Sequence, residues 1–156
     1  SRGLGDVYKR QEPSHHVIYL YNKVRQPWKT QKYVAQVMHH LYFNAPAGLC
    51  GNEDCGQMSA WYILNSMGFY QVCPGKPVYS IGRPLFEEVT INLPDRKTFV
   101  IRTHNNSKTN KYIESVLLNG KPLDVPFFTH DDLVRGGTME ITMSPVPTEW
   151  GKQVKN

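Results

Sequence analysis

The residues best suited to chemistry lie in a loop, Gly48–Trp61, that runs directly into an apolar helical pattern. It contains adjacent carboxylates at Glu53 and Asp54, flanked by the amides of Asn52 and Gln57. Carboxylates serve as general bases or metal ligands. The glycines of the loop allow backbone conformations that other residues avoid. The pattern indicates a functional loop that the following helix presents to a site.

The same residues also allow a purely structural interpretation. Asp54 can cap a helix that starts near Cys55, with Gln57 three residues later completing a capping box. This interpretation does not account for Asn52 or Glu53, and it does not exclude a second role for either acid. Both interpretations stay open from the residues alone.

A second acidic group stands near the start of the chain, where Glu12 precedes His15 and His16. Hydrolysis of a glycosidic bond needs an acid and a base, which lie roughly 6.5–9.5 Å apart in inverting enzymes. Clusters of oxygen donors also suit calcium. Composition alone does not choose between these two kinds of site.

Three other kinds of site are less well supported. The histidines and cysteines match no zinc signature in their spacing: His15–His16, His39–His40, Cys50 and Cys55. No neighbouring base orients Cys55 as a nucleophile. Trp28, Trp61 and Tyr62 are candidate sugar platforms, but aromatic residues at helical spacing more often belong to a core.

The elements that must position these residues are helices first and strands second. We expect a mostly buried helix over 17–22 and a second helix from an N-cap at Thr30 to about Phe43. The second helix has an apolar stripe at helical spacing: Val34, Val37, Met38, Leu41 and Tyr42. A third helix should run from about Cys55 to Met67 and end at Gly68.

The second half of the chain reads as an antiparallel β unit, so the fold class is α+β. Alternating apolar residues predict strands over 86–93, 98–103, 112–118 and 138–143. Asn119–Gly120 is a hairpin signal, and a short helical turn is expected from Asp131. Pro74, Gly75 and Pro77 indicate a linker between the helical and the β-rich parts.

The first eleven residues match the in-frame translation of an adapter and mosaic end used in transposase-based sequencing libraries, so we treat 1–11 as non-native. The native chain is then expected to lack its own N-terminus. Without the three basic residues and one acid of this segment, the net charge falls from +5 to +3. That charge is too small, and too scattered, to indicate nucleic-acid binding. No apolar run reaches the length of a membrane span, and three cysteines decide little about redox compartment.

Several short segments occur in a specific order along the chain: Glu12–His16, Gln26–Gln31, Gly51–Trp61, Gly68–Tyr70, Tyr79–Pro84, Leu118–Gly120 and Gly136–Gly137. Together they resemble the C-terminal end of glycoside hydrolase family 92, the calcium-dependent exo-acting α-mannosidases. The resemblance runs from Glu12 to Gly151, and the combination is specific although no single motif is. It implies that 12–70 are the last helices of a catalytic (α/α)6 barrel and that 71–156 form a β-rich C-terminal region.

The resemblance also implies roles for individual residues. Asp54 matches the family's general base, and Asn52 stands where the family has Asp or Asn. The segment that includes Glu12 matches one that lines the mannose and metal site. The implied substrate-binding residues are Glu12, His15, His16, Glu53 and Gln57, and Asn52 and Glu12 are the implied calcium ligands.

The expected parent is an inverting, calcium-dependent exo-α-mannosidase that releases terminal α-linked mannose from N-glycans or mannans, outside the cytoplasm in the periplasm, at the cell surface or secreted. Its partners are α-mannoside glycans and the rest of the parent enzyme. The family's general acid lies upstream of Glu12, so the chain as written should be inactive. The alternative is a stand-alone carbohydrate-binding or interaction module that uses the β unit. The preferred linkage, the oligomeric state and the cysteine pairing do not follow from the sequence.

Overall fold

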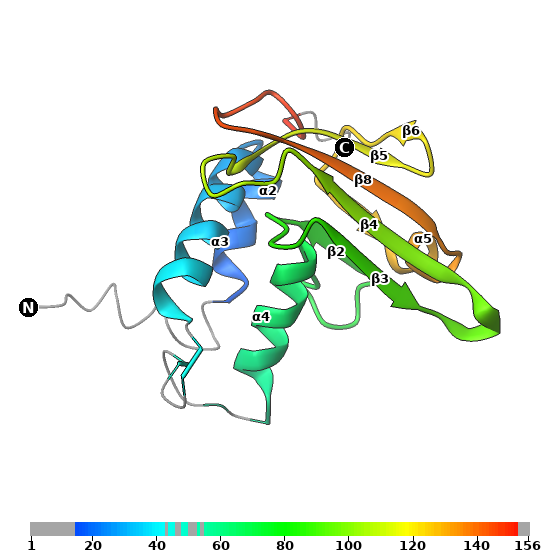
Figure 1. The fold of residues 1–156 in the computed structure, drawn as a ribbon, viewed down its shortest axis with the longest axis horizontal. Helices are drawn as coiled ribbons and strands as arrows, with labels where there is room; N and C mark the ends of the chain where they lie inside the picture. Colours follow the sequence, from blue (N-terminus) through cyan, green and yellow to red (C-terminus); the bar gives the residue numbers. More distant parts are fainter. Residues whose placement is uncertain (1–14, 43, 46–47, 50–52, 54, 153–156) are drawn as a thin grey trace, which may run out of the picture.

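The structure, a computed structural model, describes residues 15–42, 44–45, 48–49, 53 and 55–152 of the 156-residue chain. Helices occupy the first half of this part and strands most of the second half (Figure 1). The expected α+β class is therefore confirmed. Within the described part, no helix is both long and apolar enough to cross a membrane.

The first helical segment consists of η2 (Val17–Tyr19) followed by α2 (Leu20–Lys23). The prediction of a mostly buried helix here is wrong. Tyr19 and Asn22 are buried, whereas Val17 and Leu20 are 47% and 43% exposed. An apolar run is buried only where another element packs on it, and here α3 covers one side of the segment.

Helix α3 (Pro27–Leu41) starts three residues before the predicted N-cap at Thr30. Proline fits the first helical position because it has no N–H group to leave unsatisfied there. The Thr30 hydroxyl instead donates a hydrogen bond to the carbonyl of Ile18 at 3.1 Å. The predicted apolar stripe is confirmed, since Val34, Met38 and Tyr42 are buried.

Helix α4 (Gln57–Met67) follows the glycine-containing loop. Its end at Gly68 is confirmed, with a φ of 103° that suits glycine. Its start lies two residues after the predicted position near Cys55. Gln57 is consequently the first helical residue and cannot be the third residue of a capping box. Asp54, the predicted cap, lies outside the described residues.

The strands form two sheets. One has three strands in the order β1 (Phe69–Tyr70), β2 (Val78–Ile81) and β7 (Phe127–Thr129). The other has the order β3 (Glu88–Asn92), β4 (Thr98–His104), β8 (Gly137–Ser144), β5 (Tyr112–Leu118) and β6 (Lys121–Pro122). The turn η3 (Pro94–Arg96) joins β3 to β4, and helix α5 (His130–Val134) precedes β8.

Two sequence-based expectations about the strands need correction. The β unit is mixed, because β4 and β8 pair in parallel; the intervening β5, β6, β7 and α5 supply the long crossover that parallel strands require. Residues 71–77 are no linker between units: they join β1 to β2, which pair antiparallel with Phe69 opposite Ile81. The predicted hairpin at Asn119–Gly120 is confirmed, with φ values of 50° and 77° at its two central residues.

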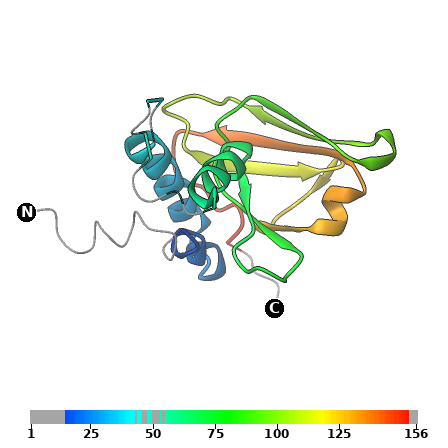
Figure 2. The same ribbon diagram turned by 90° about the horizontal axis from the view of Figure 1, so that it is seen from below.

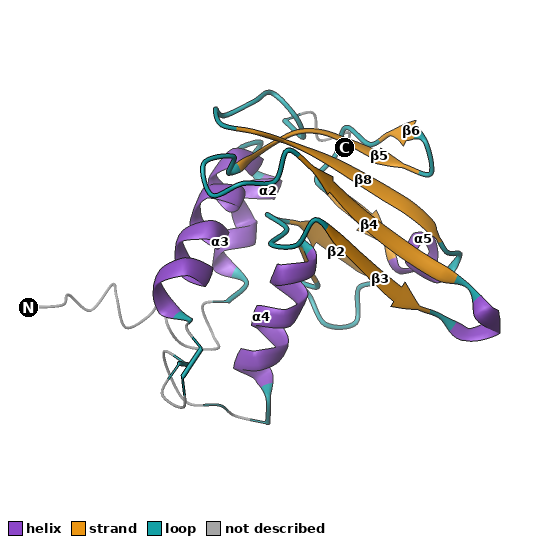
Figure 3. Ribbon diagram, viewed as in Figure 1, coloured by secondary structure: helices purple, strands orange, loops and turns teal. Residues whose placement is uncertain are grey.

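Two hydrophobic clusters stabilise the fold. The larger lies among the strands and includes Phe99, Ile101 and Ile141, while the smaller lies among the helices and includes Tyr19 and Trp61. In Figures 2 and 3 the helices α2, α3 and α4 form one half of the molecule, and the strands together with α5 form the other. Buried polar side chains tie the halves together. Gln31 Oε1 of α3 accepts from the Ile113 N–H of β5 at 2.8 Å.

Candidate functional site

The candidate site lies around the N-terminus of α4. The chain enters the helix through two residues with positive φ, Cys55 at 53° and Gly56 at 80°. The left-handed conformation at Gly56 costs little because glycine lacks a Cβ. The first N–H groups of a helix are unsatisfied and carry partial positive charge. The turn at Cys55 and Gly56 therefore places the polar N-terminus of α4 next to the residues that precede the helix.

Glu53 satisfies one of these N–H groups. Its Oε1 accepts a hydrogen bond from the Ser59 N–H at 3.2 Å, and its side chain is exposed. Glu53 therefore supplies the side-chain cap that the sequence pattern assigned to Asp54. A carboxylate at this helix end is also favoured by the helix dipole.

His15 is held against α4 although it lies 46 positions before Trp61 in the chain. The imidazole stacks on the Trp61 ring, with 4.7 Å between centroids and 22° between planes. Trp61 Nε1 also donates to the carbonyl of His15 at 3.3 Å. The Tyr42 ring stacks on Trp61 as well, and its hydroxyl lies 3.4 Å from His15 Nε2. Trp61 is fully buried and so cannot serve as the sugar platform considered from the sequence.

Gln57 places a second polar group next to His15. Its Nε2 donates to the Tyr70 hydroxyl at 3.4 Å. Within the described part of the chain, Gln57 Oε1 and His15 Nδ1 are buried and have no hydrogen-bond partner. Buried polar atoms without partners are rare, and a ligand or an ordered water commonly supplies the missing bond.

Burial lowers the pKa of His15 from its ordinary value of 6.5, and the Gln57 side chain raises it in part. The imidazole is therefore neutral near pH 7. A neutral imidazole and a carboxamide can both donate and accept hydrogen bonds. The pair can therefore hydrogen-bond an uncharged polar group or a water molecule.

The structure brings together some of the predicted site residues. Gln57 lies close enough to His15 to raise the pKa of the imidazole, and Glu53 accepts from the backbone of the helix that Gln57 begins. His16 is exposed at the start of η2. Glu12, Asn52 and Asp54 lie outside the described residues. Among the residues that are described, no group of three or more His, Cys, Asp or Glu side chains could hold a metal ion.

Sequence reasoning missed a polar network beneath the site. Tyr19 donates a short hydrogen bond to Asn65 Oδ1, and Asn65 Nδ2 donates to the Trp61 carbonyl at 2.7 Å. The Tyr19 ring stacks on Tyr70 with 5.6 Å between centroids. Burial, and then the proximity of Tyr70, raises the pKa of Tyr19 well above its ordinary value. The available signal was Asn65 itself, a polar residue at a core position of an apolar helix.

Residues 2–145 match the profile of the glycosyl hydrolase family 92 catalytic domain, and the chain belongs to that family. The matched stretch includes residues 2–11, whose sequence also matches the translated adapter.

Solved structures of the same family resemble this chain closely. A GH92 α-mannosidase from Bacteroides thetaiotaomicron, in complex with mannoimidazole, matches with a TM-score of 0.86 and 41% identity over 90% of this chain and 18% of that one. An inverting GH92 mannosidase from the same organism matches with a TM-score of 0.86 and 47% identity, over 91% of this chain and 19% of that one.

A relative of known sequence comes from the fungus Arthroderma benhamiae, where it is named an uncharacterized secreted glycosidase. It is 32% identical over 148 residues, which are 93% of this chain and 19% of that protein. The chain thus spans about a fifth of the length of the proteins that it matches.

Proposed function

We propose that this chain is the C-terminal part of an inverting, calcium-dependent exo-α-mannosidase that releases terminal α-linked mannose from N-glycans or mannans. The observation that carries the proposal is the family match, which spans residues 2–145 and so includes the loop before α4 and most of the β-rich part. The 47% identity to a structure described as an inverting mannosidase supports the stereochemical outcome.

Asp54 is the proposed general base. In an inverting enzyme a carboxylate removes a proton from a water molecule, which attacks the sugar on the face opposite the leaving group. A second carboxyl group, roughly 6.5–9.5 Å away, protonates the leaving oxygen. We assign that acid to the polypeptide upstream of Glu12. The neighbouring Glu53 accepts a hydrogen bond from the backbone of α4. The assignment of the base to Asp54 rests on the resemblance of the loop to the family.

His15 and Gln57 are proposed to bind sugar hydroxyl groups. Their free buried atoms, Nδ1 and Oε1, offer the hydrogen bonds that a desolvated hydroxyl needs. His16 and Glu12 would line the same site from the segment before η2. The neutral state of His15 suits a substrate that carries no charge.

Calcium is the proposed metal, with Asn52 and Glu12 as its ligands from this chain. Both supply the oxygen donors that calcium prefers. The bound ion would supply positive charge that helps distort the sugar toward the transition state. The protein's own residues then orient the hydroxyls and hold the water beside Asp54.

In the parent, η2, α2, α3 and α4 would be the last helices of an (α/α)6 barrel, and the barrel would complete the acid–base pair. The 156-residue chain alone would release no mannose, because the acid is absent. The parent would act in the periplasm, at the cell surface or in the medium, in keeping with the name of the fungal relative.

The test uses the recovered full-length gene. Mannose release from α-mannobiosides is measured for wild type, Asp54→Ala and Glu53→Gln, each with calcium and with a chelator. We expect Asp54→Ala and the chelated wild type to lose about 10²-fold or more in kcat, the scale of general acid–base catalysis. Glu53→Gln keeps an acceptor for the Ser59 N–H and should retain most activity.

A matched control is Asp95→Ala, which removes an exposed carboxylate from the η3 turn. If Asp54→Ala keeps near wild-type rates while Glu53→Gln loses activity, Glu53 is the base and the assignment is wrong. A gene with a start codon close to Glu12, and glycan binding by the 156-residue chain alone, would support the stand-alone module instead.

A further inference from the structure

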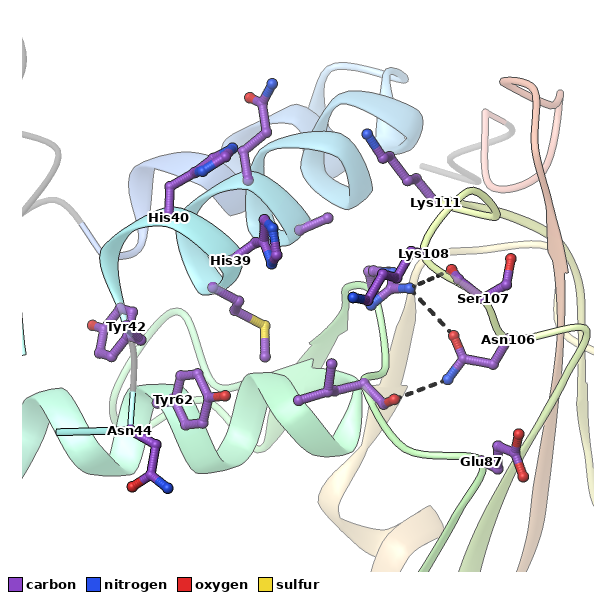
Figure 4. A pocket seen from close by; sticks show the side chains of 15 residues that line it. His39, His40, Tyr42, Asn44, Tyr62, Glu87, Asn106, Ser107, Lys108 and Lys111 are labelled. Carbon is purple, nitrogen blue, oxygen red and sulfur yellow. Dashed lines mark hydrogen bonds between the residues drawn. The ribbon is translucent and has the colours of Figure 1, made fainter. Parts of the chain in front are cut away.

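A groove of about 640 Å³ lies between helices α3 and α4 and two loops of the β-rich part, 83–87 and 105–111 (Figure 4). Its lining combines apolar side chains, such as Met38 and Leu85, with the cations Arg83, Lys108 and Lys111. Figure 4 shows Lys108 and Lys111 extending from the β4–β5 loop toward α3. The lining also includes Glu87, which offsets part of this charge, and the imidazoles of His39 and His40.

Arg83 is the unusual member of this lining because it is a cation that is only 8% exposed. Its Nη2 donates to Ser107 O at 2.8 Å and to Asn106 Oδ1 at 3.3 Å. Its Nε is buried and has no hydrogen-bond partner among the described residues. Burial lowers the pKa of Arg83, but an arginine stays charged because its ordinary pKa is so high.

No carboxylate in the described part of the chain forms an ion pair with Arg83. A buried charge without an opposite charge is strongly unfavourable. The groove is therefore complementary to an anionic group that the described residues do not supply.

We propose that this groove is an internal interface of the longer protein, occupied by an upstream segment that carries an apolar side chain and a carboxylate. The carboxylate pairs with Arg83 and with Lys108 or Lys111, and the apolar side chain packs on the exposed Leu85. The proposal rests on the proposed longer polypeptide, and it does not depend on the reaction that the polypeptide catalyses.

Two observations select this occupant. The chain spans 18–20% of the related structures, so most of the polypeptide lies elsewhere and is available to cover the groove. The cationic lining lies beside Leu85, which is 39% exposed. This mixture fits a protein segment better than a free anion, which would leave Leu85 exposed to water. Interface cores of this kind often centre on an arginine.

The first measurement is lysine acetylation with acetic anhydride, followed by mass spectrometry, in the 156-residue chain and in the recovered full-length protein. We expect Lys108 and Lys111 to react several-fold more slowly in the full-length protein. The exposed Lys97 and Lys121 do not line the groove and serve as internal controls. Equal reactivity of Lys108 and Lys111 in the two proteins would overturn the proposal.

The second measurement identifies the occupant by carbodiimide coupling of lysines to carboxylates in the full-length protein. A crosslink from Lys108 or Lys111 to an acid upstream of Glu12 supports the proposal. A crosslink to a second copy, or protection that appears only after a glycan is added, overturns it. Neither measurement uses enzymatic activity, so an inactive protein that passes both would refute the proposed function and leave this inference standing.

Matched charge-reversal variants add a test by stability. In the full-length protein, Lys108→Glu/Lys111→Glu should lower the melting temperature more than Lys97→Glu/Lys121→Glu, which makes the same change in net charge. In the 156-residue chain the two double variants should differ little. A larger effect in the isolated chain than in the full-length protein would contradict the proposal.

Discussion

The chemistry of the candidate site depends on a few buried contacts around His15. The stack on Trp61 removes one face of the imidazole from water, and desolvation is the main reason why its pKa is lowered. The folded state therefore binds a proton less readily than the unfolded state. This contribution to stability is fully present above pH 6.5, the ordinary histidine value, and is lost as the pH falls through the lowered pKa of the folded state.

The first prediction at this scale concerns Gln57→Leu in the 156-residue chain. The Gln57 side chain raises the pKa of His15 against the effect of burial. Leucine removes that polar contact and keeps the site desolvated, so the pKa of His15 should fall further. The measurement is an NMR titration of the His15 imidazole signals.

Gln36→Leu is the control, because Gln36 lies on an exposed part of α3 and should leave the titration of His15 unchanged. A pKa of His15 that stays constant or rises in Gln57→Leu would show that the two side chains do not interact. A loss of folding in Gln57→Leu would be visible in the same spectra as collapsed signal dispersion.

At the scale of single residues, the sequence indicated the types of side chain but not their surroundings. Glu53 and Gln57 stand out by their spacing, and the structure places both at the α4 terminus. The burial of His15 depends on Trp61, which lies 46 residues later in the chain, and no local pattern encodes that stack. The network through Tyr19 and Asn65 is hidden for the same reason.

At the scale of elements, local signals were reliable where chain geometry alone decides the structure. Gly68 ends α4 and Asn119–Gly120 turns the hairpin, because both places need positive φ. The failures came where tertiary contacts decide. The hydroxyl of Thr30 bonds to Ile18 rather than capping α3, and β4 pairs in parallel with β8 through a crossover that no short window can reveal.

Gly68 gives a prediction for the junction between α4 and β1. A Cβ at this position would lie 3.0 Å from Pro84 Cβ, and φ is 103°. Gly68→Ala therefore combines backbone strain with a steric clash, and it should destabilise the chain by about 2–3 kcal/mol. The measurement is unfolding in urea. The midpoint concentration should fall, while the slope of the unfolding free energy against urea concentration stays the same.

Gly75→Ala is a matched control for this substitution. Gly75 also has positive φ, at 83°, but nothing lies within 4 Å of an added Cβ. It should lose only about 1 kcal/mol from backbone strain. Equal losses in the two variants would mean that Pro84 moves aside without cost and that the α4–β1 junction is not tightly packed.

At the scale of the whole molecule, the helical half has an apolar face that is exposed in the described part of the chain. Val17, Leu20 and Val24 are 47%, 43% and 58% exposed, and their spacing of three and four residues places them on one side of η2 and α2. The sequence predicted this segment as mostly buried. An apolar run predicts burial in the core of the whole protein. Because this chain spans about a fifth of the length of its relatives, some of its apolar residues can be core residues that only the rest of such a protein would cover.

This face leads to the last prediction, on self-association of the 156-residue chain. Exposed apolar faces drive association because contact removes them from water. Leu20→Asn/Val24→Asn should reduce self-association, measured by analytical ultracentrifugation over a concentration series. The free energy of unfolding should change by less than about 1 kcal/mol, as is usual for exposed positions.

Val134→Asn is the control, since Val134 is 40% exposed but lies on α5, on the side of the molecule away from α2 (Figure 1). In the full-length protein the same double substitution should instead lower stability, because the barrel would bury Leu20 and Val24. If the substitutions are harmless in both proteins, no barrel helix covers this face, and the proposed position of η2 and α2 within the barrel is wrong.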